Sequence, residues 1–241
     1  MFGAFRDALD EHHDRRERVI KASRDITALS KKIIFSLQRV RQSDEGIPEN
    51  VAKENRARAR SIEDLFDSIS PDLQGLNIWR YQRQVSNGVQ EFIEAVSFQY
   101  YLEKEALISL REAADRMPHQ VQLTTEDYIL GVSDLTGELM RFAITTMASR
   151  GSISTDPPVK TDASDRVGPI DRKPSILIDL QSMRTYYESL DGASPSLLRS
   201  GFEKKLEVMG ASVDKVEASA YNMMIRGCER PKGWVPHVDG H

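Results

Sequence analysis

The 241-residue sequence has one cysteine, few aromatic residues and no long apolar run. Because Cys228 stands alone, neither an internal disulfide nor a thiolate zinc cluster is possible. The N-terminus becomes charged at Arg6 before it builds a signal-peptide core, and no stretch approaches the roughly 18 apolar residues of a membrane span. We therefore expect an intracellular protein, cytoplasmic or nuclear, that is neither secreted nor bound to a membrane.

An excess of positive charge is also missing. The formal net charge is −4, although 29% of the residues are charged and only 7% are aromatic. A nucleic-acid-binding protein that works alone is usually basic, because phosphate neutralisation supplies much of its affinity. Any contact with nucleic acid must therefore come from local patches or from a partner subunit.

Strand-like alternation is absent as well, and apolar residues recur instead at three- and four-residue steps. This periodicity predicts an all-α bundle of about seven helices, two of them long, in a single domain over residues 1–241. A first long helix should stop near residues 43–48, where glycine and proline disfavour continuation. Further helices are expected over about 49–68, 76–103, 124–149, 176–190 and 195–226, with a short one after Ser109.

Helix starts and one loop are marked by particular residues. Ser109 and Glu112 form a capping-box pattern, and Thr124 precedes a first turn with two acids. Ser194 followed by Pro195 is typical of a cap with proline at the first helical position. Residues 150–174 contain four prolines, many small polar residues and no aromatic, so we predict a mobile loop there.

Two pairs of acids are the strongest candidates for chemistry. Glu91 and Glu94 are spaced i, i+3, and Asp134 and Glu138 are spaced i, i+4, so each pair projects from one face of its helix. If the two helices pack with these faces together, four carboxylates converge. Four hard oxygen donors would suit Mg²⁺, with Mn²⁺ as a substitute.

Glycines accompany both acid pairs. Gly88, Gly131 and Gly137 weaken their helices, but they allow a second backbone or a substrate strand to approach closely. The alternative interpretation is that the acids are solvated, or are neutralised by arginines such as Arg83 and Arg141. A di-iron bundle is excluded, because it needs Glu-x-x-His pairs on two helices and the sequence has none.

Contact with single-stranded RNA is predicted for Arg80 and Arg83, which adjoin Trp79 and Tyr81, and for Arg141 beside the second acid pair. Aromatic residues next to cations are what single-strand binding uses. The competing interpretation places both aromatic side chains in the core and leaves the cations on a solvated face.

Four segments that span residues 12–227 resemble the translin family, and within it the branch that partners translin. They are residues 17–27, 88–99, 128–141 with its Asp-Leu-Thr-Gly-Glu-Leu-Met-Arg block, and 215–221 followed by 225–227. The resemblance implies a seven-helix protein that joins translin in a hollow hetero-oligomer, commonly octameric. It also implies Mg²⁺-dependent cleavage of single-stranded RNA, in small-RNA passenger-strand clearance or tRNA-fragment processing. The catalytic acids of the family fall on Glu91, Glu94, Asp134 and Glu138.

Two functions remain open from the sequence. In the first, the four acids hold one or two Mg²⁺ ions, which lower the pKa of a water and neutralise charge on the phosphate. In the second, the acids form salt bridges, and the chain only stabilises translin and helps it hold nucleic acid.

Overall fold

The computed structural model describes residues 2–40, 46–118, 121–150, 176–193 and 202–229. These residues form seven α-helices, one 3₁₀ turn and no strand, which confirms the all-α prediction. In chain order the elements are α1 (Phe2–Leu37), α2 (Glu49–Ile69), η1 (Ser70–Leu73), α3 (Asn77–Lys104), α4 (Leu110–Ala114), α5 (Thr125–Arg150), α6 (Ile176–Ala193) and α7 (Phe202–Glu229).

Local signals in the sequence account for two of the helix starts, those of α4 and α5. At the start of α4 the Ser109 hydroxyl accepts a hydrogen bond from the Glu112 amide at 3.3 Å, and the Glu112 carboxylate accepts one from the Ser109 amide at 2.9 Å. Thr124 caps α5 by accepting a bond from the Asp127 amide at 3.0 Å. Both predicted caps are therefore confirmed, because each satisfies amide groups that the first helical turn leaves open.

Other helix boundaries differ from the sequence prediction or lie outside the residues that the structure describes. The first helix ends at Leu37, several residues before the predicted stop at 43–48. The predicted cap at Ser194 and Pro195 lies outside the described residues. So does the predicted loop at 150–174, apart from Arg150, which ends α5.

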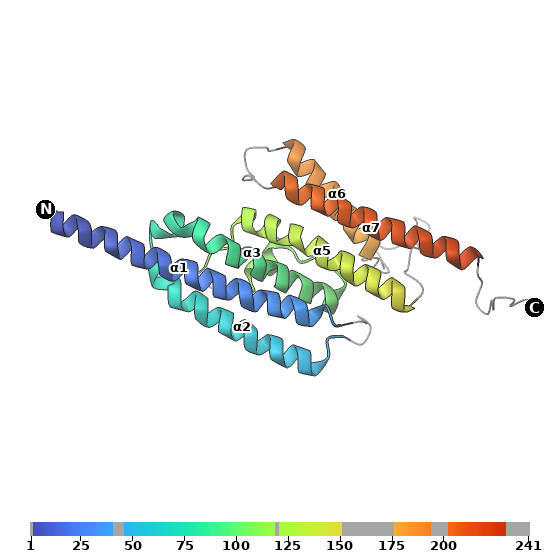
Figure 1. The fold of residues 1–241 in the computed structure, drawn as a ribbon, viewed down its shortest axis with the longest axis horizontal. Coiled ribbons are helices and arrows are strands. Elements are labelled where there is room, and N and C mark those ends of the chain that lie inside the picture. Colours follow the sequence, from blue (N-terminus) through green and yellow to red (C-terminus); the bar gives the residue numbers. More distant parts are fainter. Residues whose placement is uncertain (1, 41–45, 119–120, 151–175, 194–201, 230–241) are drawn as a thin grey trace, which may run out of the picture.

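The helices stack in an order that places α3 and α5 at the centre (Figure 1). On one side α3 packs against α1, and α1 packs against α2. On the other side α5 packs against α7, which is in turn covered by α6. Consequently a side chain between α3 and α5 is shielded by helices from both halves of the sequence.

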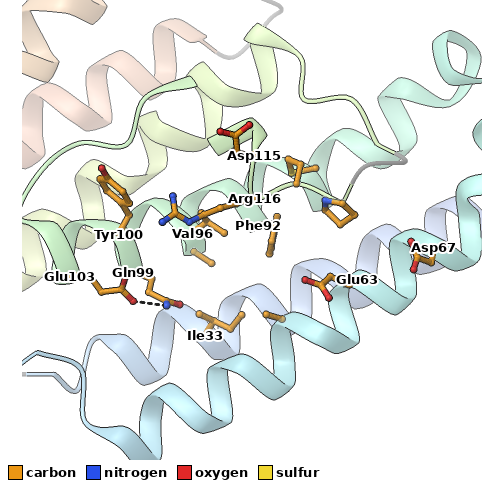
Figure 2. Close-up of a pocket in the computed structure, with 14 residues that line it drawn as sticks. Ile33, Glu63, Asp67, Phe92, Val96, Gln99, Tyr100, Glu103, Asp115 and Arg116 are labelled. Atoms are coloured by element: carbon orange, nitrogen blue, oxygen red, sulfur yellow. Dashed lines mark hydrogen bonds between the residues drawn. The ribbon is translucent and has the colours of Figure 1, made fainter. Parts of the chain in front are cut away.

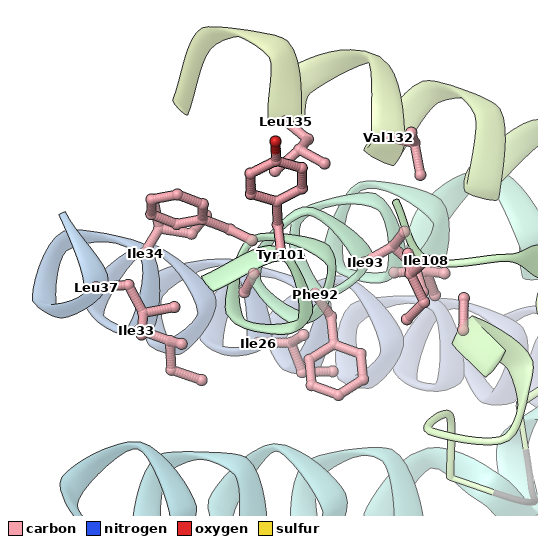
Figure 3. Packing of buried hydrophobic residues seen from close by; sticks show 14 of the residues in the cluster. Ile26, Ile33, Ile34, Leu37, Phe92, Ile93, Tyr101, Ile108, Val132 and Leu135 are labelled. Carbon is pink, nitrogen blue, oxygen red and sulfur yellow. The ribbon is translucent and has the colours of Figure 1, made fainter. Parts of the chain in front are cut away.

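The main core consists of the apolar stripes of α1, α3 and α5. Ile26, Ile93 and Leu135 are each fully buried where these three helices meet (Figure 3). Burial of each such side chain contributes about 1.5–3 kcal/mol. No helix in the described ranges is both long enough and apolar enough to span a membrane.

An ion pair between the exposed Arg18 and the buried Asp72 holds the start of the bundle together. Arg18 of α1 donates two hydrogen bonds to the Asp72 carboxylate of η1, at 2.8 and 2.7 Å. The hydrogen bonds from Arg18 hold the pKa of Asp72 below its ordinary value. This bidentate contact fixes η1, and therefore the start of α3, against α1.

Candidate functional site

Two glycines let the central helices approach one another closely. A Cβ atom on Gly88 of α3 would lie 3.0 Å from the backbone oxygen of Ser23 in α1. A Cβ atom on Gly131 of α5 would lie 2.8 Å from the backbone oxygen of Gln90 in α3. Any larger residue would push these helices apart, so the predicted close approach at Gly88 and Gly131 is confirmed. Gly137 differs, because a Cβ there would meet no atom within 4 Å.

The buried Asp127 sets the register of α5 on α3. Its carboxylate accepts hydrogen bonds from the Gln82 and Gln90 amides at 2.8 and 2.9 Å, and further bonds from the Ser86 and Thr124 hydroxyls. A buried carboxylate needs such donors to offset its lost hydration. Because three of them lie on α3, the bonds fix which turn of α5 faces which turn of α3.

At this register the two predicted acid pairs face each other. Glu91 and Glu94 project from α3, while Asp134 and Glu138 project from α5, one and two turns after Gly131. All three of the other acids act on Glu94 through their charge and raise its pKa. The sequence prediction that the four carboxylates converge therefore agrees with the structure.

Glu94 is the most unusual member of the cluster. It is only 8% exposed, yet it has no hydrogen bond or ion pair with any described residue. Burial, together with the charges of Glu91, Asp134 and Glu138, raises its pKa to about 8. At neutral pH this side chain is therefore mostly protonated unless a cation enters the cluster.

The other three acids each have a basic or amide neighbour. Lys31 of α1 lies 3.7 Å from the Glu91 carboxylate. Burial raises the pKa of Glu91, and Lys31 opposes that rise. Arg141 donates to Glu138 at 2.5 Å, and the Gln38 amide donates to the second oxygen of Glu138.

Lys205 of α7 supplies the cation nearest to Asp134. Its ammonium donates to the Oδ1 atom at 2.5 Å and also contacts Oδ2. Lys205 is not among the residues predicted from the sequence, and it lies 71 residues away from Asp134 along the chain. A signal was present, because Lys205 follows the buried Phe202 by three residues and precedes the buried Met209 by four. A lysine on the apolar face of a helix is unusual unless it has a partner.

The donor set fits a hard divalent cation. Four carboxylates from two rigid helices supply oxygen ligands of the kind that Mg²⁺ and Mn²⁺ prefer, and one of them is buried without a partner. In the described part of the chain, no three acidic, histidine or cysteine side chains already form a metal-ligating group. Oxygens of Asp134 and Glu138 instead accept hydrogen bonds from Lys205, Gln38 and Arg141.

The predicted RNA-binding arginines lie in three different environments. Arg80 is exposed and contacts the His12 ring, with its Nη1 atom 2.9 Å from Nε2. Arg83 is exposed and has no hydrogen bond or ion pair with described residues, whereas Arg141 pairs with Glu138. Trp79 is 75% exposed, so the interpretation that placed it in the core does not hold. Tyr81 is buried, as that interpretation expected.

A cavity of about 560 Å³ lies between α3 and α2 (Figure 2). Phe92 and Val96 contribute apolar surface to it, and Glu63, Asp67 and Asp115 stand around it. None of the predicted site residues lines this cavity. The acid cluster therefore remains the candidate for chemistry, because a structural role leaves its buried, unpartnered carboxyl group, Glu94, unexplained.

Fold and site together define an all-α protein with a buried carboxylate cluster between two central helices. The sequence pattern of the translin family matches residues 14–227, so the chain belongs to the translin family. Translin-associated protein X of Rattus norvegicus is 31% identical over 263 residues, which cover 98% of this chain and 82% of that protein. The Schizosaccharomyces pombe homolog is 30% identical and covers 95% of this chain and 89% of its own length. Translin of Gallus gallus is 22% identical over 95% of this chain and 93% of its own length.

Solved structures share the fold. The crystal structure of AfC3PO superposes with a TM-score of 0.61 at 18% identity, covering 93% of this chain and 97% of that one. The crystal structure of apo-NeC3PO superposes with a TM-score of 0.60 at 16% identity, covering 92% of this chain and 96% of that one. At this level of identity the likeness concerns the arrangement of helices alone.

Proposed function

We propose that this chain is the catalytic subunit of a Mg²⁺-dependent endoribonuclease that cleaves single-stranded RNA. The observation that carries the proposal is Glu94, a buried carboxylate without a partner that faces three other acids. Such a group is costly for the folded protein, since a buried acid must either stay protonated or find a cation. Strongly perturbed acids of this kind are typical of functional sites.

Glu91, Glu94, Asp134 and Glu138 would hold the cation. When bound, Mg²⁺ would lower the pKa of a water and neutralise charge that develops on the phosphate. The rigid attachment of α5 to α3 through Gly131 and the Asp127 hydrogen bonds keeps the acids in place. Lys205 and Arg141 border the cluster and supply positive charge next to where a phosphate would lie.

A hetero-oligomer with translin, octameric as in the family, is part of the same proposal. The names of the relatives, translin and translin-associated protein X, support such a partner. Exposed large apolar residues offer surface for assembly: Phe2, Phe5 and Leu9 at the start of α1, and Tyr221, Met224 and Ile225 in the second half of α7. A translin subunit would also supply basic surface for RNA to a chain with a net charge of −4.

A non-catalytic scaffold is the second candidate, and the ion pairs favour it. Arg141 with Glu138 and Lys205 with Asp134 are the neutralising contacts that a purely structural role would need. This function leaves Glu94 without an explanation, because a scaffold gains nothing from a buried acid that lacks a partner.

Substitution Asp134→Asn separates the two functions. With the chain co-purified with translin, we expect the rate of cleavage of a labelled single-stranded RNA in Mg²⁺ to fall by about 10²–10³-fold, because the amide loses the charge that helps hold the cation. EDTA should abolish cleavage by the wild type. Oligomer size and RNA binding, measured in the same samples, should remain unchanged.

The matched control is Glu63→Gln, an acid-to-amide change on the exposed surface of α2. Its cleavage rate should equal that of the wild type. If Asp134→Asn cleaves as fast as the wild type while Mg²⁺ is present, the acid cluster is not the active site and the scaffold function is supported.

A further inference from the structure

A second hollow, of about 570 Å³, lies between α1 and α3 on the side toward the acid cluster. Its lining includes three arginines, Arg16, Arg24 and Arg83, and the polar residues Thr27, Gln84 and Asn87. No acidic side chain lines it. In a chain with a net charge of −4, this hollow is a local concentration of positive charge.

Two of the three arginines lack partners. Arg24 and Arg83 are exposed, and neither has a hydrogen bond or ion pair with any described residue. Arg16 lies 3.0 Å from the Glu17 carboxylate at the surface, where such a pair contributes little. Unpaired guanidinium groups in a polar hollow are free to bind phosphate oxygens, for which their planar donor geometry is suited.

The hollow is aligned with the acid cluster because α1 and α3 run side by side in the same direction. Tyr81 contacts His12 at 2.9 Å, and about two turns further along α3 and three turns further along α1 the Gly88 amide donates to Ser23 at 3.1 Å. Still further along both helices, Lys31 lies beside Glu91. Each step toward the C-terminal end of either helix therefore leads from the arginines toward the acids.

Residue spacing continues this line on both helices. On α3, Arg83, Asn87 and Glu91 follow at four-residue steps, so they share one face. On α1, Arg24 and Lys31 are seven residues apart and also share a face. At a rise of about 1.5 Å per residue, roughly 10–12 Å separate the arginines from the Lys31 and Glu91 pair.

We propose that the α1/α3 groove binds the sugar-phosphate backbone of single-stranded RNA and leads the strand into the acid cluster. Arg24 and Arg83 bind consecutive phosphates, and Thr27 and Asn87 donate further hydrogen bonds along the path. No aromatic side chain lines the groove, so it offers no surface on which bases would stack and binds the strand through its backbone. The proposal rests on the function proposed above for its direction, but phosphate binding by the groove does not require cleavage.

Binding of a fluorescein-labelled 20-nucleotide RNA in EDTA tests the groove without any cleavage. For the double variant Arg24→Gln/Arg83→Gln, alone and co-purified with translin, we expect the Kd at 0.15 M salt to rise about tenfold. The slope of log K against log salt should fall in magnitude by about 1.4, which is two lost phosphate contacts at about 0.7 each for a single strand. Asn87→Arg should tighten binding, because it adds a cation in line with Arg83.

Arg56→Gln/Arg60→Gln is the matched control, since it removes two exposed arginines from α2, away from the groove. This control should bind RNA as the wild type does, and both double variants should keep the wild-type melting temperature. In Mg²⁺, Arg24→Gln/Arg83→Gln should raise KM while kcat at saturating RNA stays unchanged.

If Arg24→Gln/Arg83→Gln leaves the RNA affinity and the salt slope unchanged, the proposal that the groove binds RNA is wrong. This outcome includes the case in which the groove binds an acidic protein segment instead of RNA. A wild-type protein that binds RNA through these arginines but never cleaves it would refute the endoribonuclease and leave the groove supported. The two proposals therefore fail separately.

Discussion

Substitution Glu94→Gln is expected to raise the melting temperature of the metal-free protein at pH 8 and to abolish RNA cleavage. The amide has nearly the same shape as the protonated acid but cannot ionise, so it removes the electrostatic cost of burying a carboxylate among three others. The same change removes the donor that a divalent cation would use. A gain in stability together with a loss of activity is the result expected when an acid is retained for function at a cost in stability.

The pH dependence of the free energy of unfolding follows from the direction in which the pKa of Glu94 is shifted. Burial and the charges of the other three acids raise the pKa of Glu94 from its ordinary value of 4.5 to about 8 in the folded state. Between these values the unfolded chain has lost a proton that the folded protein retains, so the free energy of unfolding falls as pH rises. The stability that wild-type Glu94 contributes is therefore present below about pH 4.5 and lost as pH rises through about 8.

Thermal melts in EDTA from pH 4 to pH 9 measure this effect. We expect the free energy of unfolding of Glu94→Gln to exceed that of the wild type. The difference should grow with pH to a few kcal/mol, since a pKa difference of one unit corresponds to about 1.4 kcal/mol. The two proteins should converge near pH 4. Glu63→Gln, an exposed acid, should track the wild type throughout. A Glu94→Gln variant that melts below the wild type at pH 8 would show that the carboxylate is stabilised by contacts in the folded protein.

Lys205→Gln is expected to tighten binding of a divalent cation by about tenfold, which is about 1.4 kcal/mol. The Lys205 ammonium contacts both oxygens of Asp134, so an incoming cation has to compete with it. Removal of the lysine leaves Asp134 without its counter-charge. The metal-free variant should therefore melt at a lower temperature than the wild type and gain more from added Mn²⁺.

Isothermal titration with Mn²⁺ gives the affinity, and melts with and without Mn²⁺ give the linked stability. Lys204→Gln is the matched control, because it removes the same charge from the exposed neighbouring position. Its titration should superimpose on that of the wild type. Weaker Mn²⁺ binding in Lys205→Gln would mean that the lysine helps to build the site instead of competing for it.

The helices and the acid pairs could be predicted from the sequence because both depend on local spacing. Apolar periodicity located α2, α3 and α5 to within about a residue at each end, and the cap at Ser109 formed as its pattern indicates. The i, i+3 spacing of Glu91 and Glu94 placed both on one face, and Gly131 indicated where a neighbouring helix would approach. These features need no knowledge of the distant chain.

Contacts between distant helices could not be predicted in the same way. Lys205 reaches Asp134 only because α7 packs along α5, and Gln38 reaches Glu138 only because α1 ends beside the cluster. The parallel course of α1 and α3 aligns Arg24 with Arg83. It depends on the length and packing of α2, which connects the two helices in the sequence. Helical periodicity states which face of a helix is buried, but not which helix covers it.

Anomalous diffraction from crystals grown with Mn²⁺ would test most directly whether the acid cluster holds a catalytic cation. We predict an anomalous peak between α3 and α5, in contact with oxygens of Glu91, Glu94, Asp134 and Glu138, with the Lys205 ammonium displaced from Asp134. Crystals of Asp134→Asn should show a weaker peak or none. A wild-type crystal with Mn²⁺ bound only elsewhere, in a protein that still cleaves RNA, would contradict the assignment of this cluster as the active site.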